Sequence, residues 1–146
     1  IDPHGFLDYV HDVNVEKYLL PDARLEAMLA QLPQMKSIFT NAPGEYARRV
    51  MRVLGVEKYF TDIFDIHFIE YVSKPNPLAY DCVIAALPVP PAECLMIDDT
   101  ARNLVPAKKL GMTTVWLNGT EDRYGVEGKE SADFVIQSIY DVARLV

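Results

Sequence analysis

Short apolar runs alternate with amphipathic stretches along most of this chain. The apolar runs cover residues 35–40, 63–66, 94–97, 112–117 and 134–136. Between them, apolar residues recur at the three- and four-residue spacing of helices that bury one face, over residues 22–32, 44–54, 77–87 and 103–110. Strands that alternate with helices indicate βαβ units, so the sequence predicts an α/β fold with a mostly parallel sheet.

One apolar run, Cys94–Ile97, ends in two adjacent carboxylates, Asp98 and Asp99. Open α/β sheets bind ligands outside the carboxyl ends of their strands, which is where these side chains lie. Like charges repel each other, and a cation is the simplest partner for such a pair. Because Mg²⁺ is held by one or two carboxylates and substrate phosphate, the segment predicts a Mg²⁺ site. A solvated turn at a strand end is the alternative.

Two further segments place polar groups where strands end or helices begin. Thr40 and Asn41 end a predicted strand and lead into a helix, which offers a hydroxyl and free backbone N–H groups to an anion. Lys74 lies in a proline-braced loop before another helix. Taken singly, the first two could simply turn the chain and the lysine could be a surface charge. Since right-handed crossovers bring such ends to one sheet edge, we expect Thr40, Lys74 and the acidic pair to converge on a phosphate and Mg²⁺ site.

Length, charge and cysteine usage limit the function classes. A chain of 146 residues, half of them apolar, can form one domain with a substantial core. The net charge of −7 argues against a nucleic acid polymer or an anionic membrane as the main partner. Cys82 and Cys94 lack metal-ligand spacing, so we predict that they are core residues of a reduced, cytoplasmic protein.

The order of these segments resembles that of the haloacid dehalogenase-like (HAD) phosphohydrolases. The match runs from about Pro21 to the C-terminus. The segments similar to the family's second, third and fourth motifs are Phe39-Thr40-Asn41, Lys74-Pro75, and Ile97-Asp98-Asp99-Thr100 with Asn103. With Ile38 and Ala42 included, the pattern is most similar to the pyrimidine 5′-nucleotidase branch.

The resemblance implies a three-layer Rossmann-like core and Mg²⁺-dependent hydrolysis of a phosphomonoester through an aspartyl-phosphate. The implied substrate is a small phosphorylated metabolite, such as a nucleoside monophosphate. Thr40 and Asn41 would bind the phosphoryl group, and Lys74 would neutralise the charge that develops on it. Asp99 would bind Mg²⁺ directly, with Asp98 beside it or behind it. Asn103 would have a supporting role.

The family's first motif, Asp-x-Asp-x-Thr/Val, has no match in this sequence. That motif supplies the nucleophile from the central strand of the sheet. Residues 1–20 instead resemble the end of the small helical cap that follows the motif, and residues 21–146 resemble the α/β core without that strand. We therefore expect a C-terminal part of a longer enzyme, inactive by itself, whose exposed sheet edges favour self-association.

Three other interpretations compete with a phosphohydrolase. A phospho-receiver domain also combines an acidic pair, a threonine and a lysine, but its acidic pair comes early in the chain. A haloacid dehalogenase proper needs no Mg²⁺, so adjacent carboxylates would only repel each other. A non-catalytic HAD-like domain that binds a ligand or a partner would have no need of the retained Thr40, Lys74 and acidic pair.

Overall fold

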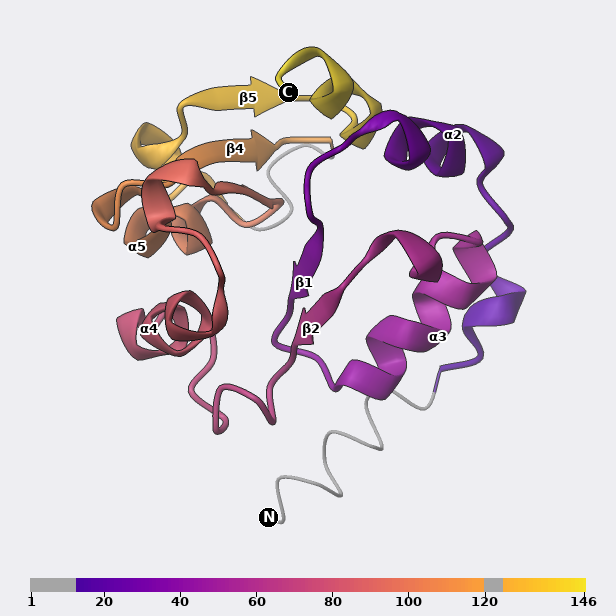
Figure 1. Ribbon diagram of the computed structural model, residues 1–146, viewed down its shortest axis with the longest axis horizontal. Coiled ribbons are helices and arrows are strands. Elements are labelled where there is room, and N and C mark those ends of the chain that lie inside the picture. Colours follow the sequence, from indigo (N-terminus) through magenta and orange to yellow (C-terminus); the bar gives the residue numbers. More distant parts are fainter. Residues whose placement is uncertain (1–12, 120–124) are drawn as a thin grey trace. The chain divides into compact units, whose positions relative to one another are not determined.

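The computed structural model describes residues 13–119 and 125–146 (Figure 1). The chain divides into two compact units, residues 1–71 and 72–146. Each unit contains parallel strands and helices, which confirms the predicted α/β class. Most of the predicted cap remnant, residues 1–12, lies outside the described residues, and the division at residue 20 stays a prediction.

The first unit is built around a two-stranded parallel sheet. Strands β1 (Ser37–Phe39) and β2 (Asp62–Phe64) pair in register from Ser37 opposite Asp62. The helical elements of this unit are η1 (Val15–Lys17), α2 (Ala23–Gln31), α3 (Gly44–Leu54) and η2 (Glu57–Tyr59). Helix α2 begins as predicted, since the Asp22 carboxylate accepts the Leu25 N–H at 2.8 Å. Helix α3 ends at Gly55, whose φ of 78° favours glycine.

The second unit contains a three-stranded parallel sheet in the order β3-β4-β5. Its strands are β3 (Leu95–Asp98), β4 (Thr113–Leu117) and β5 (Phe134–Ile136). Its helical elements are α4 (Pro77–Ala86), η3 (Pro91–Glu93), η4 (Ala101–Asn103), α5 (Leu104–Lys109), η5 (Lys129–Ser131) and η6 (Ile139–Arg144). Helix α4 begins at Pro77, and the Asn76 side chain caps it by accepting the Leu78 N–H at 3.1 Å.

The single sheet expected from the sequence is divided in two within the described residues. Strand β1 pairs only with β2, and β3 pairs only with β4, so each keeps one free edge. The central strand that the resemblance places between the two sheets stays a prediction. A free edge presents unpaired N–H and C=O groups to any further strand. Self-association through these edges stays a prediction.

The prediction that Cys82 lies in the core is wrong. Cys82 is exposed, and Leu78 on the same helix is 60% exposed. Helix α4 instead packs through Ala79, Tyr80 and Val83. Leu78 and Cys82 are four residues apart, so they share the opposite side of the helix. Cys94, which was also predicted to lie in the core, is only half-buried.

The Asp133 carboxylate links several elements at the edge of the second sheet. Asp133, just before β5, accepts hydrogen bonds from Thr114 N and Thr114 Oγ1, each at 3.0 Å, and pairs with Lys108 of α5. The bond from Lys108 and the bonds from Thr114 lower the pKa of Asp133 to about 2. One carboxylate therefore links β4, α5 and the start of β5.

Acid should remove the contribution of Asp133 to stability. Since its pKa in the folded state lies below the unperturbed value of 3.8, the carboxylate stabilises the fold above about pH 4 and loses that effect as the pH falls toward 2. We expect Asp133→Asn to flatten the dependence of the unfolding free energy on pH between pH 4 and pH 2, as measured by urea titration. Asp81→Asn, at an exposed position on α4, should keep the wild-type slope. Equal slopes in all three proteins would contradict the expectation.

No helix in the described parts of the chain is both long and apolar enough to cross a lipid bilayer.

Candidate active site

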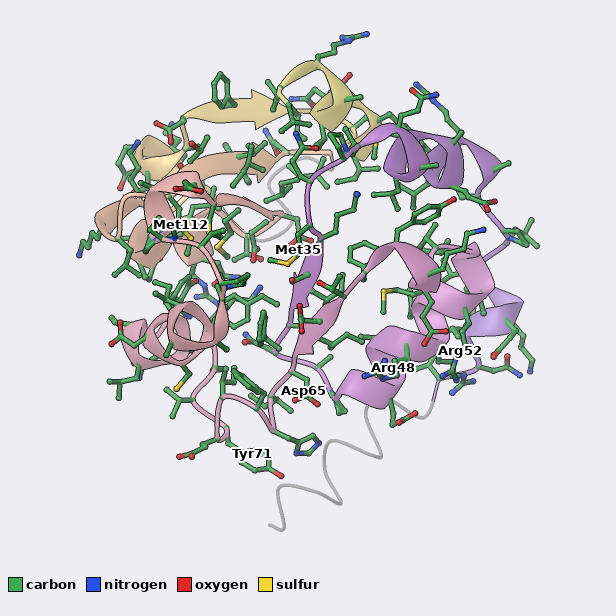
Figure 2. All side chains as sticks on the ribbon, in the orientation of Figure 1. Met35, Arg48, Arg52, Asp65, Tyr71 and Met112 are labelled. Carbon is green, nitrogen blue, oxygen red and sulfur yellow. The ribbon has the colours of Figure 1, made fainter. Side chains whose placement is uncertain are left out.

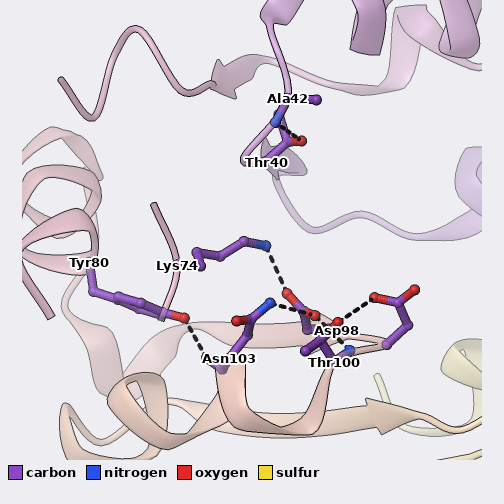
Figure 3. A network of polar contacts seen from close by, with 8 residues as sticks. Thr40, Ala42, Lys74, Tyr80, Asp98, Thr100 and Asn103 are labelled. Carbon is purple, nitrogen blue, oxygen red and sulfur yellow. Dashed lines mark hydrogen bonds and ion pairs between the residues drawn. The ribbon is translucent and has the colours of Figure 1, made fainter. Parts of the chain in front are cut away.

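Lys74 and Asp98 form a buried ion pair in the second unit. The Lys74 Nζ atom lies 2.7 Å from Asp98 Oδ2, and the two side chains are 9% and 6% exposed (Figure 3). Asp98 is the last residue of β3, and Lys74 precedes α4 by three residues. An ion pair removed from water is strong only when its remaining polar atoms are satisfied. The sequence predicted both residues for the site, and the fold brings their charged groups into contact.

The second oxygen of the Asp98 carboxylate is also bonded. Asp98 Oδ1 accepts the Thr100 N–H at 2.8 Å and the Asn103 side-chain amide at 3.0 Å. An ionised carboxylate can only accept hydrogen bonds, and here three donors surround it. The carboxylate of Asp98 is therefore held in one orientation, and it in turn holds the Lys74 ammonium group.

Asn103 occupies the position before α5 but does not cap that helix with its side chain. Its φ and ψ of −70° and −19° are helical, because the 3₁₀ segment η4 runs directly into α5. A capping residue needs extended backbone angles to turn its side chain back onto the first turn. The buried Asn103 amide bonds to Asp98 instead. The supporting role of Asn103 stays a prediction.

Asp99 has a different environment from that of its neighbour. Successive side chains of a strand point to opposite sides, and while Asp98 points inward, Asp99 is exposed at the strand end. Its carboxylate has a long contact of 3.4 Å with the Thr100 hydroxyl. Asp99 is therefore the member of the pair whose oxygens face solvent.

The Asp99 carboxylate is a donor of the type that Mg²⁺ takes. Within residues 13–119 and 125–146, no group of three or more His, Cys, Asp or Glu side chains could hold a metal ion. Mg²⁺ keeps several of its waters and is bound through one or two carboxylates. The exposed carboxylate of Asp99 fits that requirement.

Two buried aromatic residues hold the backbone of the acidic segment, and the sequence analysis missed both. The Tyr80 hydroxyl donates to the Asn103 carbonyl at 2.5 Å, and the Trp116 indole N–H donates to the Asp99 carbonyl at 3.1 Å. Burial and the nearby Asp98 charge raise the pKa of Tyr80, so its hydroxyl stays protonated and can donate. Buried tyrosine and tryptophan usually find such partners, but which partner depends on the fold.

Thr40 and Asn41 lie in the first unit, at the end of β1. Thr40 Oγ1 accepts the Ala42 N–H at 3.0 Å, and Thr40 N donates to Phe64 O at 2.9 Å, which continues the pairing of β1 with β2. Asn41 is exposed. The convergence of Thr40 with Lys74 and the acidic pair involves both units of the chain and stays a prediction.

Two of the N–H groups expected to be free near the start of α3 are bonded within the protein. The first of them, Gly44 N–H, donates to the Asp65 carboxylate at 2.8 Å, and the Ala42 N–H is taken by Thr40. Asp65 follows β2 and is 21 residues away in sequence, so only the parallel pairing of β1 and β2 places it there. The negative charge of Asp65 at the N-terminus of α3 also interacts favourably with the helix dipole. Two of the N–H groups near the start of α3 are therefore bonded within the protein, and binding of an anion by Thr40 and Asn41 stays a prediction.

A pocket of about 410 Å³ lies beside the start of α3. Arg48 and Asp65, both labelled in Figure 2, line it together with Glu45, His67 and Phe68. Its charged groups are of both signs, so it offers no clear preference for a phosphate.

Parallel βαβ units with polar groups at the carboxyl end of a strand define an α/β protein with a ligand site at a sheet edge. The family model of haloacid dehalogenase-like hydrolases matches residues 3–111, so this chain belongs to that family. The family assignment made from the sequence motifs is thereby confirmed.

Known relatives include several phosphatases. The chain is 26% identical over 118 residues to validoxylamine A 7′-phosphate phosphatase of Streptomyces hygroscopicus subsp. limoneus, covering 79% of this chain and 54% of the relative. It is 32% identical over 108 residues to glyceraldehyde 3-phosphate phosphatase of Pyrococcus furiosus, covering 72% and 44%. The chain thus spans about half the length of these curated relatives.

The fold is also similar to solved structures. The crystal structure of a HAD phosphatase from Thermococcus onnurineus matches with a TM-score of 0.69 and 27% identity, covering 92% of this chain and 65% of that one. Proteins named as phosphatases and proteins named as dehalogenases both occur among the matches.

Proposed function

We propose that the protein to which this chain belongs is a Mg²⁺-dependent phosphatase that hydrolyses a small phosphate monoester. The observation that carries the proposal is the contrast within the acidic pair. Asp98 is buried and holds Lys74, whereas Asp99 is exposed at the same strand end. The end of β3 therefore has two groups suited to this chemistry. The Lys74 ammonium group, held there by Asp98, can bind phosphoryl oxygens, and the exposed Asp99 carboxylate can bind a metal ion.

Each residue has a distinct part in this proposal. Lys74, fixed by Asp98, neutralises negative charge on the phosphoryl group, and Asp99 holds Mg²⁺, which when bound stabilises charge on the phosphoryl oxygens. Thr40 accepts a hydrogen bond from Ala42 N–H with a lone pair, so its own hydroxyl proton can be donated to a phosphoryl oxygen. Asn41 helps to position that group. The aspartate nucleophile is one that this sequence does not supply.

The substrate class that we propose is a pyrimidine nucleoside monophosphate. Support comes from the resemblance of Ile38–Ala42, Asp98, Asp99 and Asn103 to the pyrimidine 5′-nucleotidase branch. Relatives named for phosphoglycolate and glyceraldehyde 3-phosphate make these esters the first competitors. Cys82 and Cys94 are free cysteines, which fits the cytoplasmic location that we also propose.

A substrate panel tests the function. The whole protein should release inorganic phosphate from UMP and CMP faster than from phosphoglycolate or glyceraldehyde 3-phosphate, and EDTA should stop the release. Faster hydrolysis of either competitor would correct the substrate class but keep the phosphatase. Chloride release from 2-chloropropionate without Mg²⁺ would establish a dehalogenase instead. No turnover of any compound would favour the non-catalytic HAD-like domain.

A further inference from the structure

Two hydrogen bonds hold the acidic segment at its two ends. The segment runs from Asp99, after β3, to Asn103, before α5, and each of these residues gives its backbone carbonyl to a buried aromatic side chain. Tyr80 comes from α4 and is 1% exposed, while Trp116 comes from β4 and is 6% exposed. Neither belongs to the motifs on which the family resemblance depends.

The Trp116 bond acts on the exposed carboxylate. Trp116 is paired in register with Asp98 across the β3–β4 ladder and packs against Ala101 and Leu104 beneath the segment. Its indole N–H reaches past Asp98 to the carbonyl of Asp99. Fixing that carbonyl fixes the peptide plane that follows Asp99, while the β3 ladder holds the residue before it, so the two together restrict the direction in which the Asp99 side chain leaves the backbone.

The Tyr80 bond acts on the buried ion pair. Its hydroxyl holds the carbonyl of Asn103, whose side-chain amide bonds to Asp98 Oδ1, and Asp98 Oδ2 bonds to Lys74. Lys74 precedes α4 and Tyr80 lies in its first turn, so the start of this helix is joined both to the last residue of β3 and to the end of the acidic segment. Figure 3 shows this continuous set of bonds from Tyr80 to Lys74.

We propose that Tyr80 and Trp116 are positioning residues that set the acidic segment for metal binding, with Trp116 directing Asp99 and Tyr80 securing Asn103 and Asp98. The inference rests on the proposed function, because it assumes that Asp99 is the Mg²⁺ ligand. Groups that orient a metal ligand through hydrogen bonds commonly change metal affinity by about 10-fold to 100-fold when removed. Tyr80 and Trp116 act on the backbone of the acidic segment and not on the carboxylate itself, so we expect a loss of metal affinity near 10-fold.

Metal binding by the whole protein provides the test, with Mn²⁺ as the probe and electron paramagnetic resonance as the readout. Tyr80→Phe removes only the hydroxyl, and Trp116→Phe removes the indole N–H but keeps an aromatic ring. Each should weaken Mn²⁺ binding by about 10-fold. The matched control is Thr114→Val on β4, which removes a buried hydroxyl that donates to the Ser131 carbonyl at 2.6 Å, away from the acidic segment. This control should lower the melting temperature without changing Mn²⁺ affinity.

Asp99→Asn separates the inference from the function on which it rests. If Asp99→Asn binds Mn²⁺ like the wild type, the proposed metal site is wrong and the inference falls with it. If Asp99→Asn loses binding while both aromatic variants stay within about twofold of the wild type, only the inference is wrong. An equal loss of Mn²⁺ affinity in Thr114→Val would show that general destabilisation explains the effect of the aromatic variants. That result would also overturn the inference.

If an aromatic variant fails to fold, an NMR measurement on the wild-type protein tests the positioning role of Trp116. A tryptophan indole N–H resonance should shift when MgCl₂ is added to ¹⁵N-labelled protein, because that N–H is bonded to the carbonyl of the metal ligand. The shift should be absent in Asp99→Asn. Indole resonances that do not respond to saturating Mg²⁺ would contradict a positioning role for Trp116.

Discussion

Lys74→Met should reduce kcat for phosphate release by about 10²–10³-fold, because a fixed charge that stabilises the transition state is lost. The same change should destabilise the fold. It leaves the 6%-exposed Asp98 without its cation, and breaking a buried pair from one side costs about 3–5 kcal/mol. Since Asp98 keeps the Thr100 N–H and the Asn103 amide, we expect a value near the lower limit. Urea unfolding and steady-state kinetics on the whole protein measure the two effects.

Lys74→Met combined with Asp98→Asn separates stability from catalysis. With both charges removed, no uncompensated charge stays buried, so much of the lost stability should return while the activity does not. Lys58→Met is the matched control, because Lys58 pairs with Glu26 at the surface and its side chain is 62% exposed. That change should leave stability and activity almost unaltered. A double variant that regains activity would show that the ammonium group of Lys74 has no catalytic part.

Asp99→Asn should abolish the Mg²⁺ dependence of the reaction and lower kcat/KM by about 10³-fold, since the metal would no longer be held against the phosphoryl group. The effect on folding should be small. Asp99 is exposed, and its carboxylate has a long contact of 3.4 Å with the Thr100 hydroxyl. Kinetics in a Mg²⁺ titration and urea unfolding test the two statements together.

The effects of Asp98→Asn provide the comparison for those predicted for Asp99→Asn. The two residues are adjacent and chemically identical, but Asp98 holds Lys74 and Asp99 faces solvent. Asp98→Asn should therefore lower the free energy of unfolding, whereas Asp99→Asn should chiefly change the metal response. The opposite pattern, with metal dependence lost in Asp98→Asn and kept in Asp99→Asn, would reverse the roles that we assign.

Local patterns predicted most of the secondary structure. Helices were predicted over residues 22–32 and 77–87, and the Asp22 and Asn76 side chains accept the hydrogen bonds expected of caps at these starts. The apolar run before Asp98 is a strand, and Pro106 lies in the first turn of α5, where proline is tolerated. Such features depend on neighbours within a few residues. They can therefore be recognised without knowledge of the rest of the fold.

Features that depend on distant partners were predicted less well. Two N–H groups expected to be free near the start of α3 are bonded instead, the Gly44 N–H to Asp65, which follows β2, and the Ala42 N–H to Thr40. Cys82 is apolar in character and lies in an apolar helix, yet it is exposed because α4 packs on its other side. Asn103 is at a helix start, but its amide bonds to Asp98 rather than to the helix.

By itself, the sequence determined the α/β class, the order of the elements and the residues that carry charge at the strand end. These follow from periodicity and from residue chemistry, which are properties of short segments. The tertiary structure decided which carboxylate is buried against Lys74 and which faces solvent, and it brought Tyr80 and Trp116 to the acidic segment. Hydrogen bonds and burial join residues that are remote in sequence, so their partners are fixed only when the chain folds.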